Sequence, residues 1–179
     1  MSGDPRIEQV IDREMIRDCL FRYCRGIDRS DEATLRSAYW PDAVDNHGPY
    51  RGSADGFIAW AVEAFPATER NIHQIHNILI ELDGEQAFVE SYFTALSSQL
   101  GKAGNMVRWH LAGRYLDRFE KRATEWRVAD RLVVFDWAER LPPPNGSEAD
   151  RFGPRQPIGS PFPNDPLYTL RSLEKGTFS

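Results

Sequence analysis

Four strand-like runs follow one another in the second half of the chain, and this feature constrains the fold most. The runs are NIHQIHNILIEL, QAFVESYFTALSSQL, MVRWHLAGRYLDRFE and EWRVADRLVVFDW. Asp83-Gly84 is a two-residue hairpin signal, GKAGN is a longer glycine-bearing loop, and KRAT provides a third turn. Strands joined by such short turns pair antiparallel, because parallel neighbours need long crossovers. The pattern predicts an antiparallel meander over about residues 71–137.

Three helical segments precede the meander. Asp4 and Pro5 supply an N-cap and a first-turn proline for a helix over about residues 6–27, where apolar residues recur at helical spacing. Two shorter helices are expected in DEATLRSAYW, capped by Ser30, and in ADGFIAWAVEAF, capped by Ser53. Helices segregated before consecutive hairpins indicate an α+β fold in which a strongly bent sheet wraps against the helices.

The chain is expected to form one domain over residues 1–140 and an appended arm over residues 141–179. A chain of 179 residues with 41% hydrophobic content can bury a sizeable core. Eight of the twelve prolines lie between residues 141 and 170, with little periodicity. This composition suits a disordered tail or an extended arm, and its aromatic residues favour an arm that packs on its own or a neighbouring subunit.

The charge and cysteine content of the chain limit its possible partners and its cellular compartment. A net charge of -5 and a pI near 5.4, without a local run of Lys or Arg, argue against a nucleic-acid partner. No stretch approaches the ~18 apolar residues of a membrane span, and the N-terminus lacks the apolar core of a signal peptide. Cys19 and Cys24 lie too far apart on one helix for a disulfide, and free thiols suit a reducing compartment. We therefore predict a cytoplasmic protein with no nucleic-acid or membrane partner.

Sequence motifs for metal, nucleotide and covalent chemistry are missing. His73 and His76 are three apart in a strand and are expected on opposite faces, so they cannot chelate one ion together. The sequence has no zinc-type spacing, no glycine-rich phosphate loop and no G-x-S-x-G turn. We predict no metal and no cofactor, which leaves acid–base chemistry.

The strand over residues 71–82 carries the principal candidate for that chemistry. A period of two places His73, Ile75 and Asn77 on one face. A face that mixes polar and apolar groups inside a bent sheet is typical of the wall of a small-molecule cavity. His73 is thus the candidate acid or base, and Asn77 a polar wall residue beside it.

Further candidates lie at the end of the first helix and on the last strand. Tyr23 and Asp28 are five apart, and a carboxylate at a helix C-terminus opposes the dipole, although solvated charges are the simpler explanation. Arg131 lies on the apolar side of its strand and needs an anionic or polar partner. That partner could be Asp28 or a substrate oxygen, and a structural ion pair is equally compatible with the pattern.

A second group of candidates is weaker. His47 and His110 are lone histidines, each more typical of a hydrogen-bonded wall or turn residue than of a base. The aromatic residues mostly belong to the core by period, but some, including Trp40 and Tyr92, could floor a cavity. We retain these four as candidate substrate-binding residues.

Four blocks of sequence carry a resemblance to a known family. They are RYCRGIDRSD at the end of the first helix, YWPDAVDNHGPYRG before the third, IHQIHNILIELDGEQAFVESYF in the first hairpin, and GRYLDRFEKRATEWRVADRLVVFDW at the end. Together, over about residues 8–138, they resemble the SnoaL-like branch of the nuclear-transport-factor-2-like superfamily. The resemblance implies a cone-shaped α+β barrel over residues 1–140, with N-terminal helices packed on a strongly curved, mostly antiparallel sheet.

The resemblance also implies site residues. The patterns look most like hexachlorocyclohexane dehydrochlorinase, bile-acid 7α-dehydratase and scytalone dehydratase, which are cofactor-free lyases. In the first two, an Asp at the end of the first helix pairs with a His on the first long strand, and Asp28 and His73 fall on these positions. Arg131 matches an active-site arginine on the last strand. Tyr23 matches the tyrosine before the catalytic aspartate of the bile-acid enzyme.

The activity that follows is a cofactor-independent elimination. We expect loss of water, or of formaldehyde as in diarylpropane formaldehyde-lyase type relatives, from a hydroxylated, apolar and aromatic small molecule of the lignin-derived type. Isomerisation of a steroid-like substrate and small-molecule binding without catalysis are alternatives, because the fold serves both. Relatives pack the curved sheet against neighbouring subunits, so a homotrimer, or else a dimer, is expected.

Overall fold

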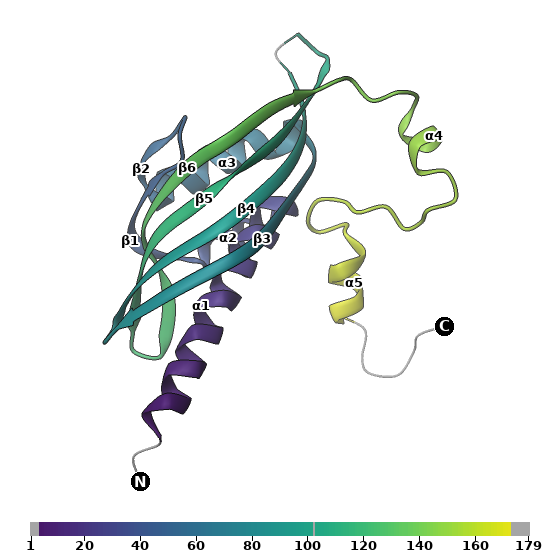
Figure 1. The fold of residues 1–179 in the computed structure, drawn as a ribbon. Helices are drawn as coiled ribbons and strands as arrows, with labels where there is room; N and C mark the ends of the chain where they lie inside the picture. The colour runs from purple at the N-terminus through teal and green to yellow at the C-terminus, as the bar shows by residue number, and fades with distance from the viewer. Residues whose placement is uncertain (1–3, 102, 173–179) are drawn as a thin grey trace.

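A computed structural model describes residues 4–101 and 103–172 of the chain (Figure 1). The helices are α1 (Pro5–Asp28), α2 (Glu32–Arg36), α3 (Ala54–Ala64), the 3-10 turn η1 (Phe65–Ala67), α4 (Glu148–Phe152) and α5 (Pro166–Ser172). The strands are β1 (Tyr39–Asn46), β2 (Arg51–Ser53), β3 (Thr68–Asp83), β4 (Gln86–Leu100), β5 (Met106–Arg122) and β6 (Glu125–Leu141). None of these described helices has the length and apolar character of a membrane span.

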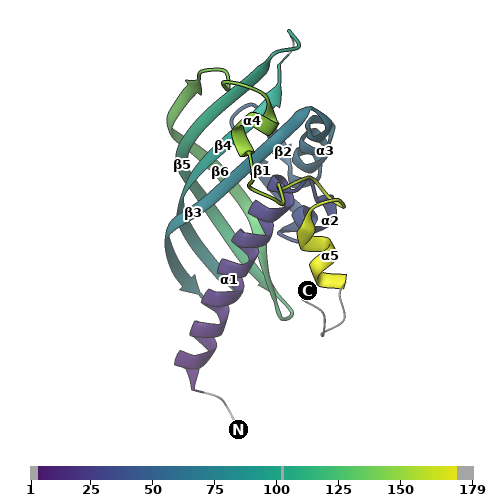
Figure 2. The ribbon, with the colours of Figure 1, turned by 90° about the vertical axis from the view of Figure 1, so that its right-hand side faces the viewer.

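The six strands form one curved sheet in the order β2-β1-β6-β5-β4-β3, with α1, α2 and α3 on one side of it (Figures 1 and 2). Strands β3 to β6 make the predicted antiparallel meander, and β1 pairs parallel with β6. β1 begins at Tyr39, inside the segment predicted as the second helix, because pairing with β6 outweighs the local helical pattern. The α+β prediction is confirmed.

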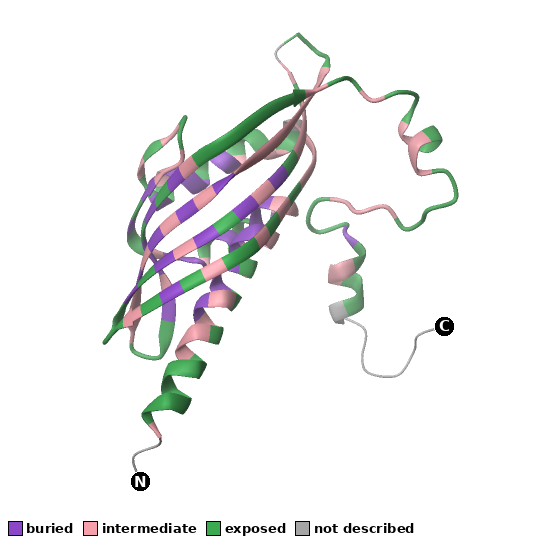
Figure 3. Ribbon diagram, viewed as in Figure 1, coloured by how far each residue is buried: buried purple, intermediate pink, exposed green. Residues whose placement is uncertain are grey.

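The inner face of the sheet and the facing side of α1 form the core. Buried and exposed bands alternate along the strands (Figure 3), because successive side chains of a strand point to opposite faces. The inner residues of the meander include Val89, Phe93, Tyr115, Phe119 and Val128. The buried face of α1 contributes Ile16, Cys19, Leu20, Tyr23 and Ile27. A largely apolar interior thus surrounds the few polar groups described below.

A close contact between α1 and α2 fixes the end of α1. Gly26 has no side chain, and a Cβ at this position would lie 2.6 Å from backbone atoms of Leu35. The backbone N–H of Asp31 donates to the Gly26 carbonyl at 2.9 Å, so the chain reverses directly after α1. Asp31, not Ser30 as predicted, is the N-cap of α2. This reversal holds Asp28, the last residue of α1, against the start of β3.

The proline-rich arm returns from the end of β6 to the helices of its own chain (Figures 1 and 2). Polar contacts join Glu148 to Arg70, Arg151 to Glu69, Asp165 to Arg29 and Tyr168 to Asp31. The arm therefore packs next to the C-terminus of α1 and the start of β3. The last part of the predicted arm, residues 173–179, lies outside the described residues.

Candidate active site

Asp28 and His73 form a direct carboxylate–imidazole pair. His73 Nδ1 lies 2.7 Å from Asp28 Oδ1, and the backbone N–H of His73 donates to both carboxylate oxygens at 3.1 and 3.0 Å. These contacts offset the unfavourable position of a carboxylate at a helix C-terminus. Only 14% of the Asp28 side chain and 13% of the His73 side chain are exposed. A carboxylate on Nδ1 fixes the tautomer that carries its proton there and leaves the Nε2 lone pair available.

Tyr23 joins this pair to a wall of aromatic rings. Its ring lies edge-on to the His73 ring, with centroids 6.5 Å apart, and 5.5 Å from the ring of Tyr115. Tyr115 stacks on Phe93 at 4.4 Å, and Phe135 meets Phe93 edge-on at 6.2 Å. Burial raises the pKa of the Tyr23 phenol far above its usual value, so the hydroxyl stays protonated. The wall is apolar with a neutral phenol within it.

Arg131 is fully buried, and its partner is Asp117 rather than Asp28. Its Nε and Nη2 each donate to one oxygen of Asp117 at 2.7 Å. Burial works to lower the pKa of the guanidinium, but the charge and hydrogen bonds of Asp117, together with Tyr39 and Tyr23, raise that pKa well above its usual range. Of the partners considered for Arg131, the structural ion pair is therefore the one present.

The surroundings of Arg131 connect it to the site. Its guanidinium lies 4.2 Å from the ring centroid of Tyr23 and 4.3 Å from that of Tyr115, within the range of cation–π contacts. In the sheet, Arg131 has Asp117 as its cross-strand neighbour on β5 and Asp45 on β1. A row of carboxylate, guanidinium and carboxylate thus crosses three strands next to the aromatic wall.

His47 lies at the same aromatic wall. Its ring stacks on Phe57 at 4.5 Å, and its centroid is 6.5 Å from that of Tyr23. His47 Nδ1 lies 3.2 Å from Oδ1 of the fully buried Asp45, and the Tyr39 hydroxyl donates to Oδ2 of Asp45 at 2.6 Å. The structure therefore places His47 next to Tyr23, whose ring is also a neighbour of His73.

The prediction that Asn77 lies beside His73 is wrong. A β-bulge interrupts the pairing of β3 with β4 between Ile75 and Ile78, and His76 and Asn77 occupy it. The bulge shifts the alternation, so Ile78 turns inward and Asn77 is exposed. His73 lies before the bulge and keeps its inward orientation.

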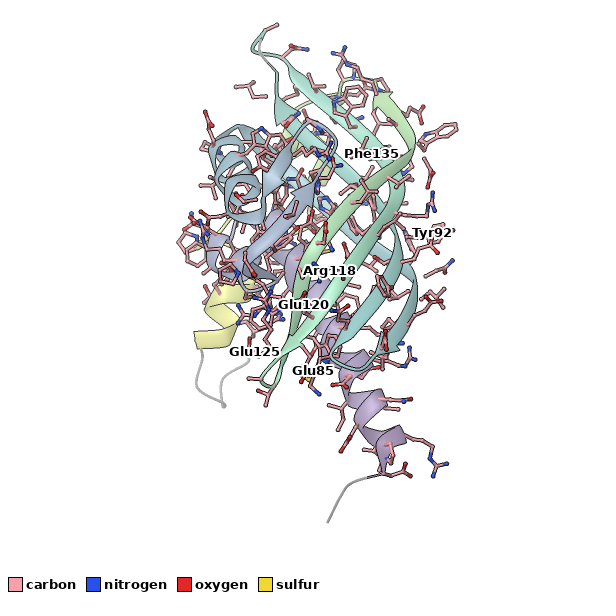
Figure 4. All side chains as sticks on the ribbon, turned by 90° about the vertical axis from the view of Figure 1, so that its left-hand side faces the viewer. Glu85, Tyr92, Arg118, Glu120, Glu125 and Phe135 are labelled. Atoms are coloured by element: carbon pink, nitrogen blue, oxygen red, sulfur yellow. The ribbon has the colours of Figure 1, made fainter. Side chains whose placement is uncertain are left out.

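Two further candidates, Tyr92 and His110, lie on the outer face of the sheet. Tyr92 is 43% exposed, and Figure 4 shows it on the side of the sheet away from the helices. It alternates with the inward-facing Phe93 along β4, which is why its own side chain points outward. His110 pairs across the sheet with Leu96, another exposed residue of this face. The structure therefore does not bring Tyr92 and His110 together with Asp28 and His73.

Trp40 also lies apart from the dyad. The guanidinium groups of Arg122 and Arg127 lie 4.9 and 4.8 Å from its ring centroid, and its Nε1 donates to the Glu120 carbonyl at 3.0 Å. Trp40 is therefore held beside the turn between β5 and β6, where Figure 4 labels Glu120. Within the described part of the chain it makes no contact with Asp28 or His73, so its predicted pocket role is not supported.

Sequence reasoning did not identify three of the polar residues around Arg131. Asp117 lies two positions after Tyr115 and two before Phe119, so it is on the same face of its strand as these two aromatic residues. This alternation is the sequence signal that indicates a buried Asp117. Asp45 and Tyr39 gave no comparable signal, because β1 pairs with β6 from a distant part of the chain. In the described residues, no three His, Cys, Asp or Glu side chains are grouped as metal ligands.

The large hollows of the surface do not coincide with this chemistry. One of about 650 Å³ lies between α1 and β6 and is lined by Phe21, Arg22 and Trp126, and another of about 630 Å³ lies across the outer face of the sheet. The hollow that includes Asp28 measures only about 10 Å³ and is bounded by Ser160 of the arm. We place the candidate site at the dyad, because the larger hollows contain no imidazole.

Comparisons with known proteins define the class of the chain. Residues 8–132, more than half of the chain, match the SnoaL-like domain family. The chain therefore belongs to the SnoaL-like domain family, which confirms the family resemblance seen in the sequence. A sequence comparison with functionally characterised proteins finds no match.

Solved structures share the fold at low sequence identity. Hexachlorocyclohexane dehydrochlorinase of type 3 from Novosphingobium barchaimii superposes with a TM-score of 0.64 at 20% identity, covering 76% of this chain and 94% of its own. A protein of Novosphingobium aromaticivorans named as a scytalone dehydratase gives 0.65 at 16% identity, covering 73% and 88%. The Kfla4162 protein of Kribbella flavida gives 0.65 at 18% identity, covering 73% and 95%. The chain thus shares its architecture with lyase-type enzymes.

Proposed function

We propose that this protein is a cofactor-independent lyase that eliminates water or formaldehyde from a hydroxylated, apolar aromatic molecule. The observation that carries the proposal is the 2.7 Å contact between Asp28 and His73 Nδ1 beside the aromatic wall. A carboxylate-oriented imidazole is a competent general base, and the buried position of the pair shields it from bulk water.

His73 would take the substrate proton on Nε2. Asp28 holds the ring through Nδ1 and, because it also accepts the backbone N–H of His73, it cannot rotate away without losing both contacts. The same carboxylate stabilises the imidazolium that forms after proton transfer. A positioned base of this kind supplies ~10²- to 10⁴-fold of rate acceleration.

Tyr23 is the proposed donor to the oxygen that gains negative charge. Its phenol is protonated and lies beside His73. Arg131 is a positioning residue, because its charge acts through the face of the Tyr23 ring and its Nε and Nη2 are already bound to Asp117. A cation over the ring favours development of negative charge on the phenol oxygen and strengthens its hydrogen bond to substrate.

The aromatic wall supports the substrate class. Phe57, Phe93 and Tyr115 are buried and pack on one another or on His47, and the partly exposed Phe135 meets Phe93 edge-on. Aromatic surroundings of this kind suit a substrate with one or two aromatic rings of the lignin-derived type. The same base could remove a proton from carbon before water leaves, or from a hydroxyl before a carbon–carbon bond breaks and formaldehyde leaves. Both reactions need the base and the wall and no cofactor.

Mass-resolved product analysis tests the proposal. Purified, metal-stripped protein would be incubated with a panel of hydroxylated bicyclic aromatics and steroids. A product lighter than its substrate by water or formaldehyde is expected. A product of unchanged mass would indicate an isomerase, and intact substrate recovered at high enzyme loading would indicate a binding module, so either result would overturn the proposal.

The outer face of the sheet supports assembly into a homotrimer, or else a dimer. Large apolar side chains are exposed along it, including Ile72, Leu79, Phe88, Leu96 and Leu132. Burial of such a patch in a subunit contact is favourable because it removes apolar area from water. We expect light scattering to give an oligomeric mass that falls to the monomer in Phe88→Asp, and a monomeric wild type would refute the assembly.

The setting proposed for the enzyme is the cytoplasm. Cys19 and Cys24 are both free and buried, which suits a reducing compartment.

A further inference from the structure

The site holds a second carboxylate–imidazole pair. Asp45 lies 3.2 Å from His47 Nδ1, as Asp28 lies 2.7 Å from His73 Nδ1. The Tyr39 hydroxyl donates to the other oxygen of Asp45 and fixes its orientation. Both imidazoles are thus held through the same nitrogen, and among the residues that the structure describes neither uses Nε2 in a hydrogen bond.

Both imidazole rings are neighbours of the same aromatic ring. The centroids of His47 and His73 are each 6.5 Å from the centroid of Tyr23, which lies on α1. The side chain of His47 is 17% exposed and that of His73 is 13% exposed, so both rings are partly accessible; Asp45 is fully buried, whereas Asp28 is 14% exposed. His73 lies on β3 and His47 directly follows β1, so two different parts of the fold place an imidazole next to Tyr23.

The charges around the two pairs differ. Near His47, the carboxyl groups of Asp45 and Asp117 lie on either side of the single guanidinium of Arg131 in a buried row. The Tyr39 phenol beside Asp45 stays neutral, because burial raises its pKa well above its usual range, so it adds no charge to the row. His47 contacts this row through Asp45, and its imidazole is a side chain that can both carry and release a proton. The Asp28 carboxylate, in contrast, is partly exposed and accepts the backbone N–H of its own partner.

We infer that His47 is the proton donor of the reaction and His73 the proton acceptor, so that acid and base are two separate imidazoles. The inference rests on the proposed function and deepens it. In dehydration, His73 Nε2 takes a proton from carbon, the electron pair of that C–H bond forms the new double bond, and the C–O bond breaks. The leaving oxygen takes the proton from His47 Nε2 and departs as water. Solvent then returns a proton to His47 and removes one from His73.

The arrangement defines the substrate more closely. It suits a molecule in which the acidic C–H and the leaving hydroxyl are on adjacent carbon atoms, so that each faces its own imidazole. A hydroxide is a poor leaving group and needs the acid, whereas a halide leaves without a proton. The dependence of each variant on the leaving group therefore separates the two roles.

The test compares His47→Gln and His73→Gln on two substrates with one carbon skeleton, one carrying a hydroxyl and the other a halide at the same carbon. His47→Gln is expected to lower kcat by ~10²-fold or more on the hydroxyl substrate and much less on the halide. His73→Gln should lower kcat on both. The control is His76→Gln, which changes an exposed imidazole of the same strand, and circular dichroism shows that each variant is folded.

Equal losses on the two substrates in His47→Gln would overturn the inference, because a structural or binding role would not depend on the leaving group. Unchanged activity in that variant would overturn it as well. Full activity of folded His73→Gln would instead refute the proposed function, whatever His47 does. Asp45→Asn gives a second measurement, since loss of its charge should reproduce the leaving-group dependence in weaker form.

Discussion

Replacing Asp117 by leucine should destabilise the fold by ~3–5 kcal/mol, because it leaves the buried charge of Arg131 without its counterion. Arg131 has no exposed surface, and two hydrogen bonds of 2.7 Å join it to Asp117. After the substitution, the guanidinium would remain between the rings of Tyr23 and Tyr115 with Asp45 as the nearest carboxylate in the sheet. A loss of this size is a large part of the ~5–15 kcal/mol by which domains are stable.

The double variant Asp117→Leu with Arg131→Met distinguishes two causes of instability: an unpaired buried charge and the loss of a core side chain. Burying two apolar side chains in place of a charged pair is often neutral or stabilising, so the double variant should be more stable than Asp117→Leu alone. Urea unfolding followed by tryptophan fluorescence measures each free energy of unfolding. Asp130→Leu, at the exposed neighbouring position of β6, should change that free energy by no more than ~0.5 kcal/mol.

The reasoning is refuted if Asp117→Leu is as stable as the control. Additive losses, in which the double variant equals the sum of the two single variants, would also contradict it, because residues in direct contact are expected to couple.

Two further predictions concern the end of α1. Burial, aided by the charge of Asp28, raises the pKa of Cys24 to about 12, so its thiol should stay protonated and resist a thiol reagent at mildly alkaline pH until the protein unfolds. Rapid labelling of Cys24 in the native protein, with Cys19 replaced by alanine, would contradict this. Gly26→Ala should cost ~1–3 kcal/mol in urea unfolding, because the new Cβ would lie 2.6 Å from the Leu35 backbone. An unchanged free energy of unfolding would show that α2 shifts freely.

The order of helices and hairpins could be predicted from sequence because it depends on local signals. Apolar periodicity, caps and turn residues mark each element, and they place Asp28 at the end of α1 and His73 within β3. The pairing of Asp28 with His73, however, follows from the packing of α1 against β3, which the sequence suggests only through its resemblance to a family.

The sequence predictions that fail concern side chains on strands, whose surroundings depend on how each strand pairs with its neighbours. The bulge in β3 turns Asn77 outward, and nothing in the run NIHQIHNILIEL marks that position. Tyr92 was assigned to a cavity although its phase with the inward-facing Phe93 already places it outside. The partner of Arg131 depended on the registers of β6 with β5 and β1, which are tertiary properties.

The measurement that tests the central claim most directly is kcat/KM of His73→Gln on a substrate identified by product mass, beside wild type and His76→Gln. The account predicts a loss of ~10²- to 10⁴-fold in His73→Gln, with the same melting temperature as wild type, and no loss in His76→Gln, whose exposed ring contacts Thr94 on the outer face. Asp28→Asn should show a loss in the same direction, because the imidazole would lose the carboxylate that orients it. Wild-type turnover by folded His73→Gln would contradict the account.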